Sequence, residues 1–278
     1  MKVCAIVVTY NPNINEFNKF FKTNKLEVDY SIIVDNSDDK KKQNQILGFK
    51  NESDTEVIQL LTNKGIAYAQ NIGIDRVKEL ENFDFVLFLD QDSMLNIGTV
   101  NTYKVFYNEL SLKYNIAALG IGTTDSDMNS ELYMEVNQII SSGTFSPISC
   151  FQEIGVFDED LFIDFVEYDW CWRAKKNKYK IFSINSIKLI HKHGDGKINI
   201  LGFKMVNPTP IRHYYQYRNL LYMLTTSHVP ILWKLKMFFK TIIKTPLYIV
   251  ILNKKKQRIK FIYSGIRDFI LNKKGKFE

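Results

Sequence analysis

Residues 85–93, FVLFLDQDS, combine a short apolar run with two acids placed one residue apart. A continuously apolar run of this length is typical of a strand buried on both faces, as in a parallel sheet. Asp90 and Asp92 repel each other at such a strand end unless a cation lies beside them, and Mg²⁺ or Mn²⁺ prefers such oxygen ligands. If the strand continues through Asp92, both carboxylates face the same side. The alternative is a strand exit that merely ends in acids.

The chain on the N-terminal side of this stretch alternates strands and helices. We expect strands over residues 2–9, 30–34, 56–61 and 85–89, and helices over residues 14–21 and 65–80. This alternation predicts an α/β fold with a mainly parallel sheet and helices on both faces. In such sheets the ligand crevice lies at the carboxyl ends of the strands.

Polar residues follow each of the four predicted strands. They are Thr9, Asn11, Asp35, Asn63, Gly65 and Asp90. Alone, an Asp-Asn-Ser segment such as residues 35–37 is most often a turn, and an Asn-x-Gly segment such as residues 63–65 is most often a helix cap. Four polar strand ends that meet at one edge of a sheet favour a nucleotide-binding site instead.

Composition narrows the classes of protein. The 278 residues, 45% of them hydrophobic, are enough for one large domain or for one domain with an appendage. The first residues lack the pattern of a signal peptide, and three widely spaced cysteines predict reduced thiols in a cytosolic protein. No zinc-finger or helix-turn-helix pattern is present, which argues against a nucleic-acid-binding protein.

The positive charge is concentrated near the C-terminus. Residues 233–278 hold thirteen Lys or Arg and two acids, a net charge of +11, so the remaining chain carries −4 of the total +7. Residues 229–252 are apolar but interrupted by lysines, and Lys236, Lys240 and Lys244 share one face of a helix. We expect a body over residues 1–225 and a basic amphipathic tail over residues 226–278, which binds an anionic membrane surface without spanning it. The alternative is an ordinary solvated helix that packs on the body.

Ordered motifs across residues 3–222 resemble the family 2 glycosyltransferases, which have the Rossmann-like GT-A fold. The motifs of the first half are Thr9-Tyr10-Asn11, Val34-Asp35-Asn36-Ser37, Asn63-x-Gly65, Asn71-x-Gly73 and Asp90-x-Asp92. Those of the second half are Ser142-Gly143-Thr144-Phe145, the segments at residues 155–159, 161–164 and 167–173, His191-x-x-Gly194-Asp195, and Arg212-x-Tyr214-Tyr215-x-x-Arg218-Asn219. The Asp-Gln-Asp-Ser, Leu-Phe-Ile-Asp and Arg-Asn segments are most similar to the bacterial rhamnosyltransferase branch.

The resemblance implies a role for each matching residue. Asp35 would accept the ring N–H of a pyrimidine, with Thr9 and Asn11 in the same pocket, and Asn63 and Gly65 would let the backbone approach the nucleotide. Asp90 would hold the ribose, and Asp92 a Mg²⁺ or Mn²⁺ ion that neutralises the leaving diphosphate. His191 would be a third ligand of that ion, although imidazole suits Mn²⁺ less well than carboxylate does. Arg212 and Arg218 would grip the diphosphate, unless they form surface ion pairs.

The catalytic base implied by the resemblance lies in residues 163–173, IDFVEYDWCWR. Glu167 occupies the position of the family's catalytic aspartate, although its side chain is one methylene longer, and Asp169 is the second candidate. The alternative for both acids is that they only favour the positive end of a helix.

The combined interpretation is an inverting, metal-dependent glycosyltransferase, peripheral at the cytoplasmic face of the membrane. It would transfer L-rhamnose from dTDP-L-rhamnose to a polyprenyl-linked glycan in the synthesis of a bacterial surface polysaccharide. Two alternatives stay open: the same fold with a UDP-sugar donor (galactose, glucose or galactofuranose), and a non-catalytic membrane scaffold.

Overall fold

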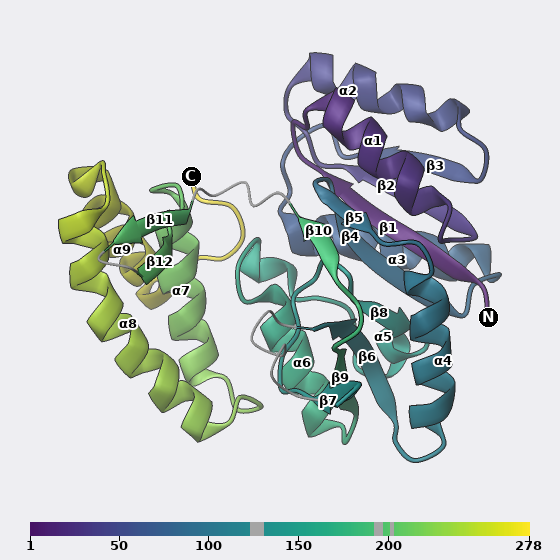
Figure 1. Cartoon of the computed structure of the whole chain (residues 1–278). Coiled ribbons are helices and arrows are strands. Elements are labelled where there is room, and N and C mark those ends of the chain that lie inside the picture. Colours follow the sequence, from purple (N-terminus) through teal and green to yellow (C-terminus); the bar gives the residue numbers. More distant parts are fainter. Residues whose placement is uncertain (123–130, 192–196, 201–202) are drawn as a thin grey trace.

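The computed structural model describes residues 1–122, 131–191, 197–200 and 203–278. Within these residues, eight strands form the central sheet in the order β3-β2-β1-β4-β8-β6-β9-β7 (Figure 1). The strands are β1 (Val3–Thr9), β2 (Tyr30–Asp35), β3 (Thr55–Gln59), β4 (Phe85–Asp90), β6 (Ile116–Ile121), β7 (Tyr133–Glu135), β8 (Phe145–Pro147) and β9 (Lys180–Ile184). Strands β1 to β4 are parallel, as is the β6–β9 pair, whereas β8 is antiparallel to both β4 and β6. The predicted mixed, mainly parallel α/β sheet is confirmed.

Helices cover both faces of the sheet, and β1 shows why. All seven of its residues are buried. Cys4, Ile6 and Val8 pack with α3 and α6 on one face, and the alternate residues pack with α1 and α4 on the other. The helices of this body are α1 (Ile14–Lys25), α2 (Lys40–Leu47), α3 (Ile66–Leu80), α4 (Thr99–Ser111), α5 (Cys150–Glu153) and α6 (Val166–Lys176), with short 3-10 turns η1 (Gly48–Asn51) and η3 (Glu159–Leu161). The three cysteines are free and buried, as expected for reduced thiols.

Two small strand pairs lie outside the central sheet. The strand β5 (Ser93–Leu95) pairs antiparallel with β10 (Leu189–His191), and β11 (Lys197–Ile200) pairs antiparallel with β12 (Phe203–Val206). The first pair matters for the site, because β5 begins directly after Asp92.

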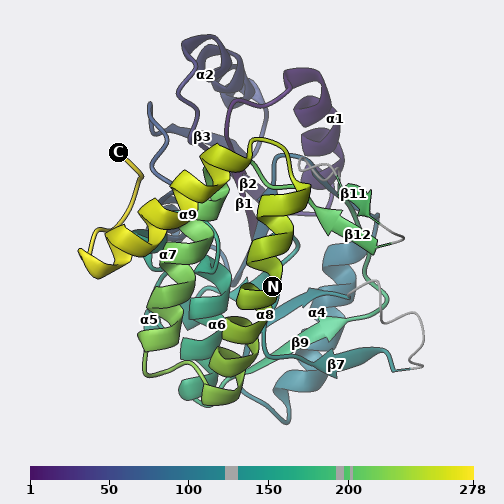
Figure 2. The same ribbon diagram turned by 90° about the vertical axis from the view of Figure 1, so that its left-hand side faces the viewer.

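Three C-terminal helices form a layer beside the sheet (Figures 1 and 2). They are α7 (Arg212–Thr225), α8 (Ile231–Ile251) and α9 (Lys255–Ile270). The helices α7 and α9 pack so closely that a Cβ on Gly265 would lie 2.5 Å from the carbonyl oxygen of Tyr214. The proposed boundary after residue 225 stays a prediction, since α7 on one side of it packs against α9 on the other.

The helix α8 has no fully buried side chain, so the rest of the protein covers it only in part. Its exposed apolar residues include Leu232, Leu235, Phe239, Ile243 and Val250. Among the described residues, no helix combines the length and the apolar character needed to cross a bilayer.

Candidate active site

The carboxyl ends of the first four strands meet at one cavity of about 520 Å³, which we call the sheet-edge cavity. Among the predicted site residues, it is lined by Thr9, Asn63, Gly65, Asp90, Asp92 and Arg212. It is also lined by residues for which the sequence predicted no role, namely Tyr10, Gln91, Lys276 and Phe277. The parallel register of β2, β1 and β4 brings these segments together, since each strand ends level with its neighbour.

Asp35 lies at the base of this edge and is fully buried. Its Oδ1 accepts hydrogen bonds from the hydroxyls of Thr9 (2.9 Å) and Ser37 (2.6 Å). Its Oδ2 is also buried but has no hydrogen-bond partner among the described residues. An unsatisfied buried carboxylate oxygen is costly, so this atom is a ready acceptor for a ligand N–H. Its neighbours Thr9 and Asn36 line the cavity.

Hydrogen bonds between loops hold this edge in one arrangement. The Asn36 side chain donates to Asn63 Oδ1 (3.1 Å) and accepts from the backbone N–H of Lys64 (2.7 Å). Asn11 donates from Nδ2 to Asp38 (2.7 Å), although it does not itself line the cavity. These bonds fix the loops before any ligand binds, which lowers the ordering cost of binding.

Gly65 is required by its neighbours and not only by a ligand. Its φ of +92° favours glycine, and a Cβ there would lie 2.6 Å from the Phe162 ring and 2.7 Å from the Phe162 carbonyl oxygen. The backbone N–H of Ile66 donates to that same carbonyl at 2.8 Å. Gly65 therefore lets the start of α3 approach the loop that precedes α6.

The fourth strand does not continue through Asp92, so the condition under which a strand pleat would place both carboxylates on one side is not met. Strand β4 ends at Asp90, and Gln91 and Asp92 form a turn before β5. The Gln91 side chain accepts a hydrogen bond from the backbone N–H of Tyr10 (2.7 Å), which ties the turn to the end of β1. Both Asp90 and Asp92 nevertheless line the sheet-edge cavity, so a turn brings them together and not the pleat of a strand.

The donor set at this turn fits a divalent cation. Two carboxylates supply the hard oxygen ligands that Mg²⁺ and Mn²⁺ prefer, with substrate phosphates completing the coordination. Among the described residues, no group of three potential metal ligands exists. The backbone of His191 lies opposite Ser93, the residue after Asp92, whereas residues 192–196 lie outside the described part of the chain. The metal roles of Asp92 and His191 stay predictions.

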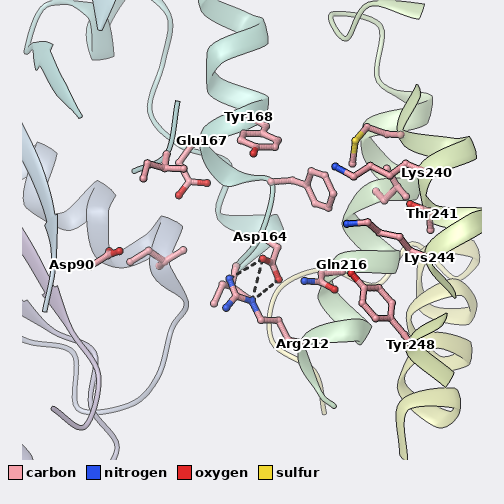
Figure 3. A pocket seen from close by; sticks show the side chains of 16 residues that line it. Asp90, Asp164, Glu167, Tyr168, Arg212, Gln216, Lys240, Thr241, Lys244 and Tyr248 are labelled. Atoms are coloured by element: carbon pink, nitrogen blue, oxygen red, sulfur yellow. Dashed lines mark hydrogen bonds and ion pairs between the residues drawn. The ribbon is translucent and has the colours of Figure 1, made fainter. Parts of the chain in front are cut away.

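A second cavity of about 580 Å³, the helical cavity, lies between α6, α7 and α8 (Figure 3). Its polar lining consists of Asp90, Asp164, Glu167, Tyr168, Arg212, Gln216, Lys240, Thr241, Lys244 and Tyr248. Asp90, Ile66, Ile163 and Arg212 line both cavities, so the two adjoin.

Glu167 lies in the first turn of α6, half-buried in the wall of the helical cavity. The pKa of this carboxyl is raised to about 7, chiefly by burial and also by the charges of Asp90 and Asp164, whereas its own backbone hydrogen bond and Arg212 act in the opposite direction. A carboxylate with a pKa near neutrality is suited to accept a proton at physiological pH. Asp164 is held by Arg212, whose Nη2 donates to it at 3.0 Å and Nε at 3.1 Å.

Asp169 has a different environment from Glu167. It is buried, and its two oxygens accept hydrogen bonds from Arg173 Nε (2.8 Å) and His228 Nε2 (2.7 Å). It lines neither the sheet-edge cavity nor the helical cavity. The position of Asp169 supports a structural ion pair that joins α6 to the turn before α8.

Arg218 and Asn219 hold the loop between η3 and α6. The guanidinium of Arg218 is buried and donates to the carbonyls of Asp160 (2.9 Å) and Leu161 (3.1 Å). Asn219 Nδ2 donates to three carbonyls, those of Leu161, Ile163 and Asp164, at 2.8 to 3.0 Å. Phe162, Asp164 and Phe165 have positive φ, a conformation that only such support maintains. The predicted contact of Arg218 with a diphosphate gains no support from this position.

Comparison with solved structures places the fold. The chain is similar to TarS of S. aureus in complex with UDP-GlcNAc, with 18% identity, a TM-score of 0.63, and 97% of this chain and 81% of that one covered. It is also similar to GalNAc-T7 with UDP, GalNAc and Mn²⁺, with 11% identity, a TM-score of 0.54, and 98% and 57% of the chains covered. The fold is GT-A.

Comparison with curated proteins adds the class of enzyme. The chain is 28% identical to the dTDP-rhamnosyl transferase RfbF of Shigella flexneri, over 95% of each chain. No protein-family model matches it. The chain is thus a glycosyltransferase with the GT-A fold. The predicted resemblance to this group, and to its rhamnosyltransferase branch in particular, is confirmed.

Proposed function

We propose that the protein is an inverting rhamnosyltransferase. It transfers L-rhamnose from dTDP-L-rhamnose to a hydroxyl of a polyprenyl-linked glycan in bacterial surface-polysaccharide synthesis. The relative named a dTDP-rhamnosyl transferase supports the donor. The observation that carries the mechanism is the position of Glu167 in the helical cavity, beside the junction with the sheet-edge cavity.

The sheet-edge cavity is the proposed donor site. The unused Oδ2 of Asp35 would accept the N–H of the pyrimidine ring, and Asp90 and Asp92 would hold the ribose and a Mg²⁺ or Mn²⁺ ion. When bound, that ion supplies positive charge against the diphosphate leaving group. Thymine and uracil offer the same ring N–H, so a UDP-sugar is the second candidate donor, and the likeness to a TarS structure with UDP-GlcNAc favours keeping it.

The helical cavity is the proposed acceptor site. Glu167 takes the proton from the acceptor hydroxyl while that oxygen attacks the anomeric carbon of the sugar. The bond from this carbon to the diphosphate breaks on the opposite face, so the configuration inverts and the nucleoside diphosphate leaves. With a pKa of about 7, roughly half of the Glu167 side chains are ionised and competent at pH 7.

We place the protein on the cytoplasmic face of the membrane, as a peripheral protein. The exposed apolar residues of α8 and the net charge of +11 over residues 233–278 support this location. Two lysines of the predicted basic face, Lys240 and Lys244, line the helical cavity, so the apolar face of α8 is the part left to meet the lipid.

Calorimetry and a transfer assay test the proposal together. We expect dTDP to bind more tightly than UDP in the presence of Mg²⁺ or Mn²⁺. This binding should weaken strongly with EDTA, in Asp92→Ala and in Asp35→Asn, which replaces one acceptor oxygen by an NH₂ donor. Asp75→Ala, an exposed acid on α3, is the control for loss of charge. Preference for UDP would indicate a UDP-sugar donor in place of dTDP-L-rhamnose, and the protein would still be a glycosyltransferase. Absence of binding by either nucleotide would leave a non-catalytic scaffold.

A further inference from the structure

The helical cavity has two walls of opposite charge. Asp90, Asp164 and Glu167 come from the sheet and the start of α6, whereas Lys240 and Lys244 come from α8. In Figure 3 the two lysine side chains extend from α8 into the space, toward the side that carries Asp164 and Glu167. Because residues four apart share a helical face, both ammonium groups point into one region of the cavity.

Neither lysine is neutralised by the protein. Arg212 is paired with Asp164, but within the described residues no hydrogen bond or ion pair engages the ammonium of Lys240 or Lys244. Burial, together with the neighbouring charges of Lys244 and Lys236, lowers the pKa of Lys240. Two like charges on one cavity wall repel each other, and an anion between them would remove that repulsion.

We propose that Lys240 and Lys244 form a subsite for a phosphate or diphosphate group of the acceptor. This inference rests on the proposed function and adds the charge of the substrate and the residues that recognise it. The lysines lie in the same cavity of about 580 Å³ as Glu167, a volume in the range of one small ligand. The accepting hydroxyl therefore belongs to a sugar close to the phosphate, and not to the far end of a long glycan.

The phosphate could come from two sources, the linker of the acceptor or the headgroup of a membrane phospholipid. The position of the lysines favours the acceptor. Lys240 and Lys244 line the cavity with Thr241 and Tyr248, whereas the apolar residues Phe239, Ile243 and Val250 are exposed on α8. At 100° per residue, these two sets lie on different sides of the helix.

The test measures binding of geranyl diphosphate by calorimetry to full-length protein already saturated with dTDP and Mg²⁺. Prior saturation prevents the probe from occupying the donor site, and geraniol serves as the uncharged probe. Charged hydrogen bonds of this kind change affinity by about tenfold each, so Lys240→Ala/Lys244→Ala should weaken binding by about a hundredfold. Lys234→Ala/Lys236→Ala, with the same loss of charge on the same helix but outside the cavity lining, should change binding less than threefold, which is a small effect on this scale.

Three further measurements make the outcome decisive. Lys240→Arg/Lys244→Arg should restore most of the affinity, and the unfolding temperature of each variant checks that it is folded. The dTDP affinity should be unchanged in Lys240→Ala/Lys244→Ala, and a fall in it would overturn the inference by assigning the lysines to the donor. Equal binding of geranyl diphosphate by wild type and variant would also overturn it.

Vesicles that contain phosphatidylglycerol distinguish the lipid source. If the cavity variant loses vesicle binding but keeps geranyl diphosphate binding, the lysines serve the membrane and the inference is wrong. If the proposed function itself is wrong, the result is different: the wild-type protein would bind neither dTDP nor UDP in the first step of the titration.

Discussion

Replacing Glu167 with glutamine should nearly abolish transfer and yet stabilise the protein at alkaline pH. The pKa of this carboxyl rises from 4.5 to about 7 in the folded protein, chiefly because of burial. Each pKa unit corresponds to 1.36 kcal/mol, so ionisation of Glu167 destabilises the folded state by about 3 kcal/mol. Glutamine has nearly the same shape and is neutral at every pH.

The sign follows from proton linkage. A pKa that is higher in the folded state means that the folded protein holds the proton more tightly. The resulting stabilisation is fully present below the unfolded pKa of 4.5 and is lost as the pH rises through 7. Relative to wild type, Glu167→Gln should therefore raise the free energy of unfolding by about 3 kcal/mol at pH 8 and by less than about 1 kcal/mol at pH 5.

Thermal unfolding measures the difference. A chain of 278 residues has an unfolding entropy of about 0.6 kcal/mol/K, so the variant should melt about 5 °C higher than wild type at pH 8 and within about 1 °C of it at pH 5. Glu109→Gln makes the same chemical change at an exposed position of α4 and should show neither effect. A shift of the same size at both pH values would refute the account of Glu167 as a partly buried carboxylate whose ionisation destabilises the fold.

The pH dependence of wild-type kcat/KM reports the same group. The ionised form is the active base, so kcat/KM should rise about tenfold per pH unit below pH 7 and level off above it, while Glu167→Gln should lose a factor of about 10² to 10⁴. A variant that keeps more than a tenth of the activity would show that another residue takes the proton.

Two other changes probe the support around the site. Asp169→Asn leaves Arg173 and His228 with a weaker partner, so it should lower the free energy of unfolding by about 2 kcal/mol while kcat/KM falls less than tenfold. Chemical denaturation and initial rates measure these two effects. A loss of activity as large as in Glu167→Gln would make Asp169 the base. Gly65→Ala should lower the free energy of unfolding by about 1–3 kcal/mol and also weaken dTDP binding, because its Cβ would collide with Phe162. The control is Gly48→Ala, which should have neither effect because no atom lies within 4 Å of its Cβ. Equal stability of the two glycine variants would argue against the close approach of α3 and the Phe162 loop.

The sequence predicts the body of the fold well, because periodicity is a local property. The first four strands and the helices at residues 14–25 and 66–80 follow from apolar runs and spacing, and the observed boundaries differ by a few residues. The antiparallel β8 and the β11–β12 pair are three or four residues long, too short to leave a periodic signal. The turn at Gln91 and Asp92 depends on a bond to Tyr10, which no local pattern reveals.

Site residues divide in the same way. Residues at the ends of parallel strands, such as Thr9 and Asp90, can be predicted to meet because the topology of the sheet brings them together. The partner of the Arg218 side chain cannot be predicted from its motif, since a guanidinium can donate to backbone carbonyls as well as to phosphates. The four-residue spacing of Lys240 and Lys244 is visible in the sequence, but the direction of their shared face is set by the packing of α8 against α7 and α9.

The two faces of α8 constrain how a lipid-linked acceptor reaches Glu167. A helix with its side chains is about 10 Å across, so the cavity-facing lysines lie about that far from the exposed apolar face. The headgroup region on each side of a bilayer is about 5–8 Å deep, so a phosphate at that depth cannot meet Lys240 through the helix. If α8 lies on the membrane, the acceptor must pass around one of its edges. Substitutions at an edge, such as Lys236, should then change vesicle-dependent transfer without changing the binding of geranyl diphosphate.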